Sequence, residues 1–191
     1  MGREFELKYR ATPEKIADIK GKFGDFTPIS METFYYDTKD GNLSSLRWTL
    51  RRRMENGRSV CTLKTPLPDG SRGEWETEAD TIEGSIEALC KLGAPKELLT
   101  LTETELICTC GARFLRLAAT IQQEEVTVEL ALDQGVLLGG GRELPFGEVE
   151  VELKSGSEPA AVAFARKLAE EFSLTPEPKS KIQRALELAS L

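Results

Sequence analysis

Charged side chains at every second position mark two segments, EFELKYR near the N-terminus and GEVEVELKSG near the C-terminus. The alternating residues are Glu4, Glu6, Lys8, Glu148, Glu150 and Glu152. In a β-strand, side chains two positions apart lie on one face of the sheet. Carboxylates this close repel each other, at a cost on the order of 2 kcal/mol per contact before screening. A divalent cation removes that cost, so the pattern indicates a candidate Mg²⁺ or Mn²⁺ site.

Segments between these two ends carry further charged residues in the same alternation. They are Arg51, Arg53, Lys64, Arg72, Glu74, Glu76, Glu129 and Asp133. For any single strand, a solvated outer face is the simpler interpretation. If about eight strands close into a barrel, however, the interior holds one small ligand, and enclosed charges need partners. Glutamates that bind a metal and basic side chains that bind phosphates would have such partners within a single inner cavity.

The composition limits the chemistry that this chain of 191 residues can perform. It has no histidine, which excludes serine–histidine catalysis and histidine-bound zinc. Its four cysteines form no CxxC pair and are interpreted as small buried thiols. The net charge of −7 argues against a nucleic-acid surface. Because the N-terminus lacks the apolar core of a signal peptide and no apolar run could cross a bilayer, we expect a cytoplasmic protein.

Strands and helices are predicted from hydrophobic periodicity and from turn and cap signals. The strands are expected over 3–10, 33–37, 48–54, 59–65, 73–79, 112–122, 125–133 and 147–154, and the helices over 12–23, 83–92, 157–172 and 179–191. Turns are expected at Asp133-Gln134-Gly135 and at Gly139-Gly140-Gly141. No repeat or linker interrupts the chain, which predicts one α+β domain over residues 1–191.

The ordered motifs resemble those of the CYTH superfamily, the triphosphate tunnel metalloenzymes. The matching segments are EFELKYR, FYYDT at 34–38, TLRRR at 49–53, TLK at 62–64, RGEWE at 72–76, ELALDQG at 129–135, GEVEVELKSG at 147–156 and KSKIQRAL at 179–186. The first motif alone is weak, because short charged alternations are common, but the full ordered set spans nearly the whole chain. The resemblance implies an eight-stranded antiparallel β-barrel, a tunnel with a charged lumen and helices packed outside, and a substrate that carries a linear triphosphate.

The resemblance also implies roles for the charged residues. The metal ligands would be Glu4, Glu6, Glu148 and Glu150, with Glu152 second in rank and with Asp133 and Glu76 as metal-side or water-positioning groups. Phosphate oxygens would be bound by Lys8, Arg51, Arg53, Lys64, Arg72, Arg113 and Lys181, and Arg184 lies one helical turn beyond Lys181. Arg116 is the alternative to Arg113, and Lys154 is expected on the solvent side. For Lys8, phosphate binding is preferred to a general-base role.

Several functions remain open within this resemblance. Hydrolysis of inorganic tripolyphosphate to pyrophosphate and phosphate ranks first, because the motifs look most like those of bacterial inorganic triphosphatases. Thiamine triphosphatase ranks second and class IV adenylate cyclase third. A non-catalytic polyphosphate- or nucleotide-binding module is the alternative from another class. The expected partner is a small-molecule triphosphate, without nucleic acid or membrane, and a homodimer is left open.

Overall fold

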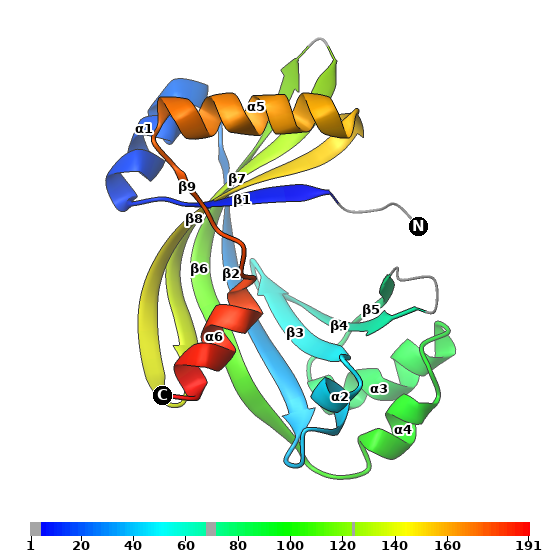
Figure 1. The fold of residues 1–191 in the computed structure, drawn as a ribbon. Coiled ribbons are helices and arrows are strands. Elements are labelled where there is room, and N and C mark those ends of the chain that lie inside the picture. Colours follow the sequence, from blue (N-terminus) through cyan, green and yellow to red (C-terminus); the bar gives the residue numbers. More distant parts are fainter. Residues whose placement is uncertain (1–4, 68–71, 124) are drawn as a thin grey trace. The chain divides into compact units, whose positions relative to one another are not determined.

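The computed structural model describes residues 5–67, 72–123 and 125–191, and within them one antiparallel sheet carries the charged motifs (Figure 1). Its strands are β1 (Glu6–Arg10), β2 (Thr27–Thr38), β3 (Thr49–Glu55), β4 (Arg58–Pro66), β5 (Arg72–Glu78), β6 (Leu106–Gln123), β7 (Val126–Gly139), β8 (Arg142–Gly156) and the two-residue β9 (Thr175–Pro176). Their order is β5-β4-β3-β2-β6-β7-β8-β1-β9. The eight long strands agree with the predicted number. Among the described residues, hydrogen bonds do not join the two end strands, β5 and β9.

The helices are α1 (Pro13–Phe23), α2 (Asn42–Ser45), α3 (Ile82–Lys91), α4 (Glu97–Leu101), α5 (Glu158–Glu171) and α6 (Lys181–Ala189). Side-chain caps start three of them: Thr12 accepts from the backbone N–H of Lys15, Thr81 from Gly84 and Ser157 from Ala160. Such caps satisfy donors that the first turn leaves unpaired. The four predicted helices are therefore present, and the short helices α2 and α4 are additions.

The chain divides into two compact units, and the long strands β2, β6, β7 and β8 each contribute to both. The first unit comprises Met1–Ile29, Phe114–Val136 and Leu144–Ser180, and the second comprises Ser30–Arg113, Leu137–Glu143 and Lys181–Leu191. The single domain over residues 1–191 stays a prediction.

In the first unit, one face of the sheet is apolar and is covered by helices. Val149 and Val151 from β8 and Leu130 from β7 are fully buried there against α1 and α5, which supply Ile19 and Ala165 among others. Figure 1 shows both helices on this part of the sheet. Because side chains alternate along a strand, the charged residues of β1, β7 and β8 lie on the opposite face. This confirms the predicted division between an apolar, helix-covered face and a charged face.

In the second unit, α3 and α4 cover the apolar face of β3 and β4. Leu50 and Leu63 pack there with Leu89 and Leu98 of the two helices. The opposite face carries rows of polar residues that the strand register fixes. Arg51 lies opposite Thr62, which lies opposite Glu76.

Several predicted strand boundaries are wrong. The predicted turn at Asp133-Gln134-Gly135 is absent from β7, which continues to Gly139. The chain reverses at Gly140 and Gly141, whose φ angles are 57° and 73°, values that favour glycine. Fully buried Leu137 and the pairing of β7 with β8 outweigh the local turn signal. Likewise β6 starts at Leu106 rather than at Ala112, and β2 at Thr27 rather than at Thr33.

Candidate metal centre and phosphate-binding face

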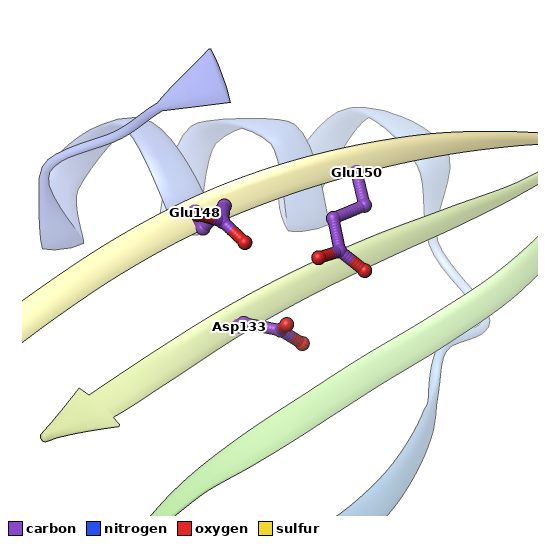
Figure 2. Close-up of side chains that lie close together, drawn as sticks. All are labelled: Asp133, Glu148 and Glu150. Atoms are coloured by element: carbon purple, nitrogen blue, oxygen red, sulfur yellow. The ribbon is translucent and has the colours of Figure 1, made fainter. Parts of the chain in front are cut away.

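Three carboxylates of the first unit form a buried cluster (Figure 2). Asp133 comes from β7, and Glu148 and Glu150 come from β8; one carboxylate oxygen of each lies within 4.8 Å of the others. Asp133 and Glu148 are 0% exposed, and Glu150 is 9% exposed. The position of the cluster follows from strand alternation, because the intervening Val149 and Val151 face the helix-covered core. The sequence-predicted metal ligands Asp133, Glu148 and Glu150 are thus brought together.

Arg116 on β6 binds two members of this cluster. Its Nε donates to one Asp133 oxygen at 2.8 Å and its Nη2 to the other at 2.7 Å, and Nη2 also donates to Glu150. Burial alone would lower the pKa of Arg116, but the hydrogen bonds and negative charges of Asp133 and Glu150 outweigh burial and raise it above its ordinary value. The guanidinium is therefore a permanent positive charge within an acidic cluster.

The strand β1 brings further predicted residues to the charged face of the first unit. Lys8 pairs in register with Glu150, and Glu6 pairs with Glu152. The Lys8 Nζ lies 3.9 Å from an oxygen of Glu6. Glu4, predicted as a metal ligand, lies outside the described residues.

Glu152 is separate from the buried cluster and binds a lysine instead. The Lys154 Nζ lies 2.8 Å from Glu152 and 3.5 Å from Glu129. Lys154 is exposed, as expected, with 40% of its side chain accessible. Its parity nevertheless places it on the same face of β8 as the glutamates, rather than on the opposite face.

The second unit gathers basic side chains on the polar face of β3 and β4. The Lys64 Nζ lies 3.0 Å from Glu74, and the Arg51 guanidinium lies 3.8 Å from both Glu74 and Glu76. Thr62 donates to Glu76 at 2.9 Å. Beside this row, Arg53 lines a groove of about 370 Å³ together with Thr62 and Glu76. Predicted phosphate-binding residues and the predicted water-positioning Glu76 are thus neighbours.

Arg51 is held in surroundings that disfavour its charge. Burial lowers its pKa below the ordinary value, and the neighbouring Arg53 lowers it further. The buried Nε atoms of Arg51 and Arg53 have no hydrogen-bond acceptor among the described residues. Leaving a buried donor without an acceptor costs about 1–3 kcal/mol. An anion that accepts from these donors would remove this cost.

The remaining predicted phosphate-binding residues lie elsewhere in the second unit. Arg72 is exposed at the start of β5. Arg113 is paired with Glu143 at 2.5 Å, and its side chain is 48% exposed. Lys181 and Arg184 are partly buried on α6, which packs so closely on β7 that a Cβ on Gly139 would overlap the carbonyl oxygen of Ala185. The binding roles of these residues stay predictions.

The arginine of β6 that points to the charged face is Arg116, not the preferred candidate Arg113. Alternation along β6 is the signal that indicates Arg116. Leu117 packs against the helix-covered core of the first unit, so its neighbour Arg116 must point to the charged face. Arg113 shares the parity of Leu117. Alternation in β6 is ambiguous because Phe114, of the opposite parity to Leu117, is also large and apolar. Phe114 lies on the charged face, and the Arg116 guanidinium is 5.8 Å from the centre of its ring.

The carboxylate cluster fits a divalent cation of the kind that the sequence predicts. Its donors are all hard oxygens, which Mg²⁺ and Mn²⁺ prefer, and three ligands leave coordination positions for water or substrate. Two of the three carboxylates are fully buried, and buried like charges require a cation beside them. Arg116 contacts two members of this set, Asp133 and Glu150.

No described helix combines the length and apolar character needed to cross a membrane.

Comparison with known proteins agrees with the geometry. The CYTH domain matches residues 2–186. An inorganic triphosphatase from Haemophilus influenzae is 27% identical over 197 residues, which cover 100% of this chain and 56% of the relative. The chain therefore spans about half the length of that curated relative.

Solved structures show the same fold. A putative adenylyl cyclase from Hippeastrum, described as having a dominant triphosphatase activity, is 20% identical with a TM-score of 0.68, over 99% of this chain and 97% of that chain. A putative adenylate cyclase from Bacillus halodurans is 24% identical with a TM-score of 0.63, over 95% of this chain and 96% of that chain. An antiparallel sheet with helices on its apolar face thus matches the tunnel fold that the motifs predicted.

Proposed function

Because this chain belongs to the CYTH domain family, we propose that it hydrolyses a triphosphate with a divalent metal, and that inorganic tripolyphosphate is the substrate. The observation that carries the proposal is the buried set of Asp133, Glu148 and Glu150. If this face were only solvated, its carboxylates would be exposed. Nothing would then favour three of them within 4.8 Å of one another, where they repel. The inorganic triphosphatase of Haemophilus influenzae supports the choice of substrate.

The carboxylates of the first unit would hold Mg²⁺ or Mn²⁺. Asp133, Glu148 and Glu150 are the proposed ligands, and Glu4 and Glu6 join them on the strength of the family motif. When bound, the metal would neutralise charge on phosphate oxygens and lower the pKa of a coordinated water. Glu152 is a weaker candidate because it binds Lys154.

The basic side chains would bind the phosphates. Guanidinium groups donate two parallel hydrogen bonds to phosphate, and lysine acts as a point charge. Arg51 and Arg53 each have a buried donor that finds no acceptor in the described part of the chain, and a phosphate oxygen would accept from it. We assign the same role to Lys8, Lys64, Arg72, Arg113, Lys181 and Arg184.

Hydrolysis would transfer a terminal phosphoryl group to water. The water oxygen forms a bond to the terminal phosphorus and loses a proton to solvent, the bridging P–O bond breaks, and pyrophosphate leaves. Such a reaction needs positioning and charge neutralisation more than covalent help. The proposed group that orients the water is Asp133 in the first unit. Glu76, which accepts from Thr62 at 2.9 Å in the second unit, is the alternative candidate.

The direct test is phosphate release from tripolyphosphate, thiamine triphosphate and ATP, each with Mg²⁺, Mn²⁺ or EDTA. We expect release from tripolyphosphate to be fastest, to require metal, and to fall at least about 100-fold in Glu148→Gln. The matched control is Glu87→Gln, which removes an exposed carboxylate paired with Lys91 on α3.

The other outcomes of this assay identify the alternatives. Faster release from thiamine triphosphate would change the substrate, and cyclic AMP formed from ATP would make the chain a cyclase, as two of the similar structures are named. Tight binding of tripolyphosphate without turnover would make it a binding module. A cytoplasmic location and a homodimer stay predictions from the sequence.

A further inference from the structure

We propose that Arg116 is a positioning residue that substitutes for the divalent cation in the metal-free protein and competes with it for the carboxylates. This inference rests on the proposed metal site. It concerns how the empty site is kept folded and how strongly it binds metal.

The contacts of Arg116 are those of a cation that bridges two ligands. Its Nε and Nη2 contact both oxygens of Asp133 at 2.8 and 2.7 Å, and Nη2 also reaches Glu150. Two of the three proposed ligands are therefore engaged by one guanidinium. The arginine side chain is 18% exposed and that of Asp133 is 0% exposed, so water screens the pair only weakly.

The guanidinium also lies close to an aromatic ring. It lies 5.8 Å from the centre of the Phe114 ring, a distance at which an arginine is attracted to an aromatic face. Phe114 in turn packs edge to face on Phe146 of β8, with ring centres 5.7 Å apart. Arg116 is thus held by its contacts with Asp133 and Glu150 and by the nearby Phe114 ring.

A divalent cation at the same carboxylates meets this positive charge at close range. Like charges repel strongly where exposure is low, and Asp133 and Glu150 cannot be fully shared by a metal and a guanidinium fork. Binding of metal must therefore weaken the contacts of Arg116. Because linkage is reciprocal, those contacts must weaken metal binding by the same factor.

Removal of Arg116 should then have opposite effects on the two states. Metal-free Arg116→Gln should unfold at a lower temperature, because Asp133 and Glu150 lose the positive charge that contacts both of them. The same variant should bind Mn²⁺ about tenfold more tightly, because the competing charge is gone. A residue with a merely structural role would lower stability in both states and would not strengthen metal binding.

The experiment measures Mn²⁺ affinity by calorimetry and the melting temperature with EDTA or saturating Mn²⁺, all without substrate. The proteins compared are the unaltered chain, Arg116→Gln, Arg116→Lys, Glu148→Gln and Arg166→Gln. Arg166 is an exposed arginine on α5, so its variant controls for the loss of one positive charge in the first unit. Arg116→Lys keeps the charge without the planar fork, and should bind Mn²⁺ with an affinity between those of the unaltered chain and Arg116→Gln.

The inference predicts that Mn²⁺ raises the melting temperature of Arg116→Gln more than that of the unaltered chain, while Arg166→Gln matches the unaltered chain. If Arg116→Gln is unfolded in EDTA, Mn²⁺ should restore a cooperative melting transition. Equal or weaker Mn²⁺ binding by Arg116→Gln, or no folding in either condition, would overturn the competition. Failure of the proposed metal site itself would look different, because the unaltered chain and Glu148→Gln would then respond to Mn²⁺ alike.

Discussion

Lys8 on β1 and Glu150 on β8 are direct partners in the antiparallel ladder that joins the first and eighth strands. The pairing brings two motifs from opposite ends of the sequence onto one face of the sheet. It also places a lysine beside the buried carboxylate cluster, to which Glu150 belongs. A positive charge that is close to proposed metal ligands is well placed to receive an oxygen of a metal-bound phosphate.

Lys8→Met should weaken the use of tripolyphosphate while keeping the aliphatic stem of the side chain. A hydrogen bond to a charged group contributes about 1.5–3 kcal/mol, so we expect kcat/KM to fall about 10- to 100-fold. Steady-state phosphate release measures the change. Lys20→Met, at an exposed position of α1, is the control, and equal kcat/KM for both variants would remove Lys8 from the binding set.

Arg51→Met should separate stability from ligand binding. Burial and Arg53 disfavour the charged guanidinium, as the lowered pKa of Arg51 shows. Replacing a buried ion pair by apolar side chains is often neutral or stabilising. The partners of Arg51, Glu74 and Glu76, are 38% and 50% exposed in their side chains, so both carboxylates stay hydrated when Arg51 is replaced. We therefore expect the free energy of unfolding without ligand to stay equal or to rise by up to roughly 2 kcal/mol.

The same Arg51→Met protein should lose most of the stabilisation that tripolyphosphate gives to the unaltered chain, because a ligand stabilises only in proportion to its binding. Denaturant unfolding with and without tripolyphosphate measures both effects. Arg58→Met removes an exposed arginine paired with Glu78 and should change neither quantity by more than about 0.5 kcal/mol. A variant that is less stable yet still stabilised by tripolyphosphate would contradict the assignment.

Gly139→Ala should displace α6. The added Cβ would overlap the carbonyl oxygen of Ala185 and lie 2.8 Å from the backbone nitrogen of Ala189. Such overpacking typically lowers the free energy of unfolding by about 1–3 kcal/mol. Because α6 carries Lys181 and Arg184, we also expect a higher KM for tripolyphosphate.

The control for this variant is Gly21→Ala in α1, where an added Cβ would meet no atom of the described residues within 4 Å. Alanine is favoured over glycine inside a helix by about 0.5–1 kcal/mol, so Gly21→Ala should raise stability. Destabilisation of both proteins to the same extent would mean that the contact between Gly139 and α6 is unimportant.

Cys110 should make stability depend on pH in the alkaline range. Burial raises the pKa of its thiol from 9.0 to about 11, because the interior disfavours the thiolate. The folded state therefore keeps the proton longer than the unfolded state does. The contribution is complete below about pH 9 and is lost as the pH rises from 9 toward 11.

Urea unfolding of the unaltered chain and of Cys110→Ala between pH 7 and 11 isolates this effect. The difference in unfolding free energy between the two proteins should be constant up to about pH 9 and should decrease above it. Subtraction removes the contributions of other groups, such as Tyr9, whose pKa burial also raises. A difference that is flat across the whole range would show that the thiol is not sequestered.

Much of the charged face could be predicted from the sequence, because strand alternation is a local property. Glu148 and Glu150 alternate with Val149 and Val151, and only one of these two faces can enter an apolar core. The four longer helices were predictable for the same reason, since their caps and prolines are local signals.

Features that depend on distant partners were harder to predict. The choice between Arg113 and Arg116 depends on which face of β6 meets the helix-covered core, and local alternation leaves both phases open. Asp133-Gln134-Gly135 looks like a turn in isolation, yet pairing with β8 keeps it in a strand. No pattern within β6 alone indicates that Arg116 contacts Asp133, since the contact requires β6 and β7 to be neighbours.

The ladder between β1 and β8 has a consequence for the chain while it is being synthesised. Glu6 can pair with Glu152 only after the 146 later positions have been synthesised. At ribosomal rates this synthesis takes about 7 to 30 s. Until then the first strand has exposed N–H and C=O groups on both edges, and such edges can pair with other nascent chains. Charges at every second position discourage that pairing. The charges proposed here for catalysis are therefore of the kind that disfavours edge-to-edge pairing of this strand.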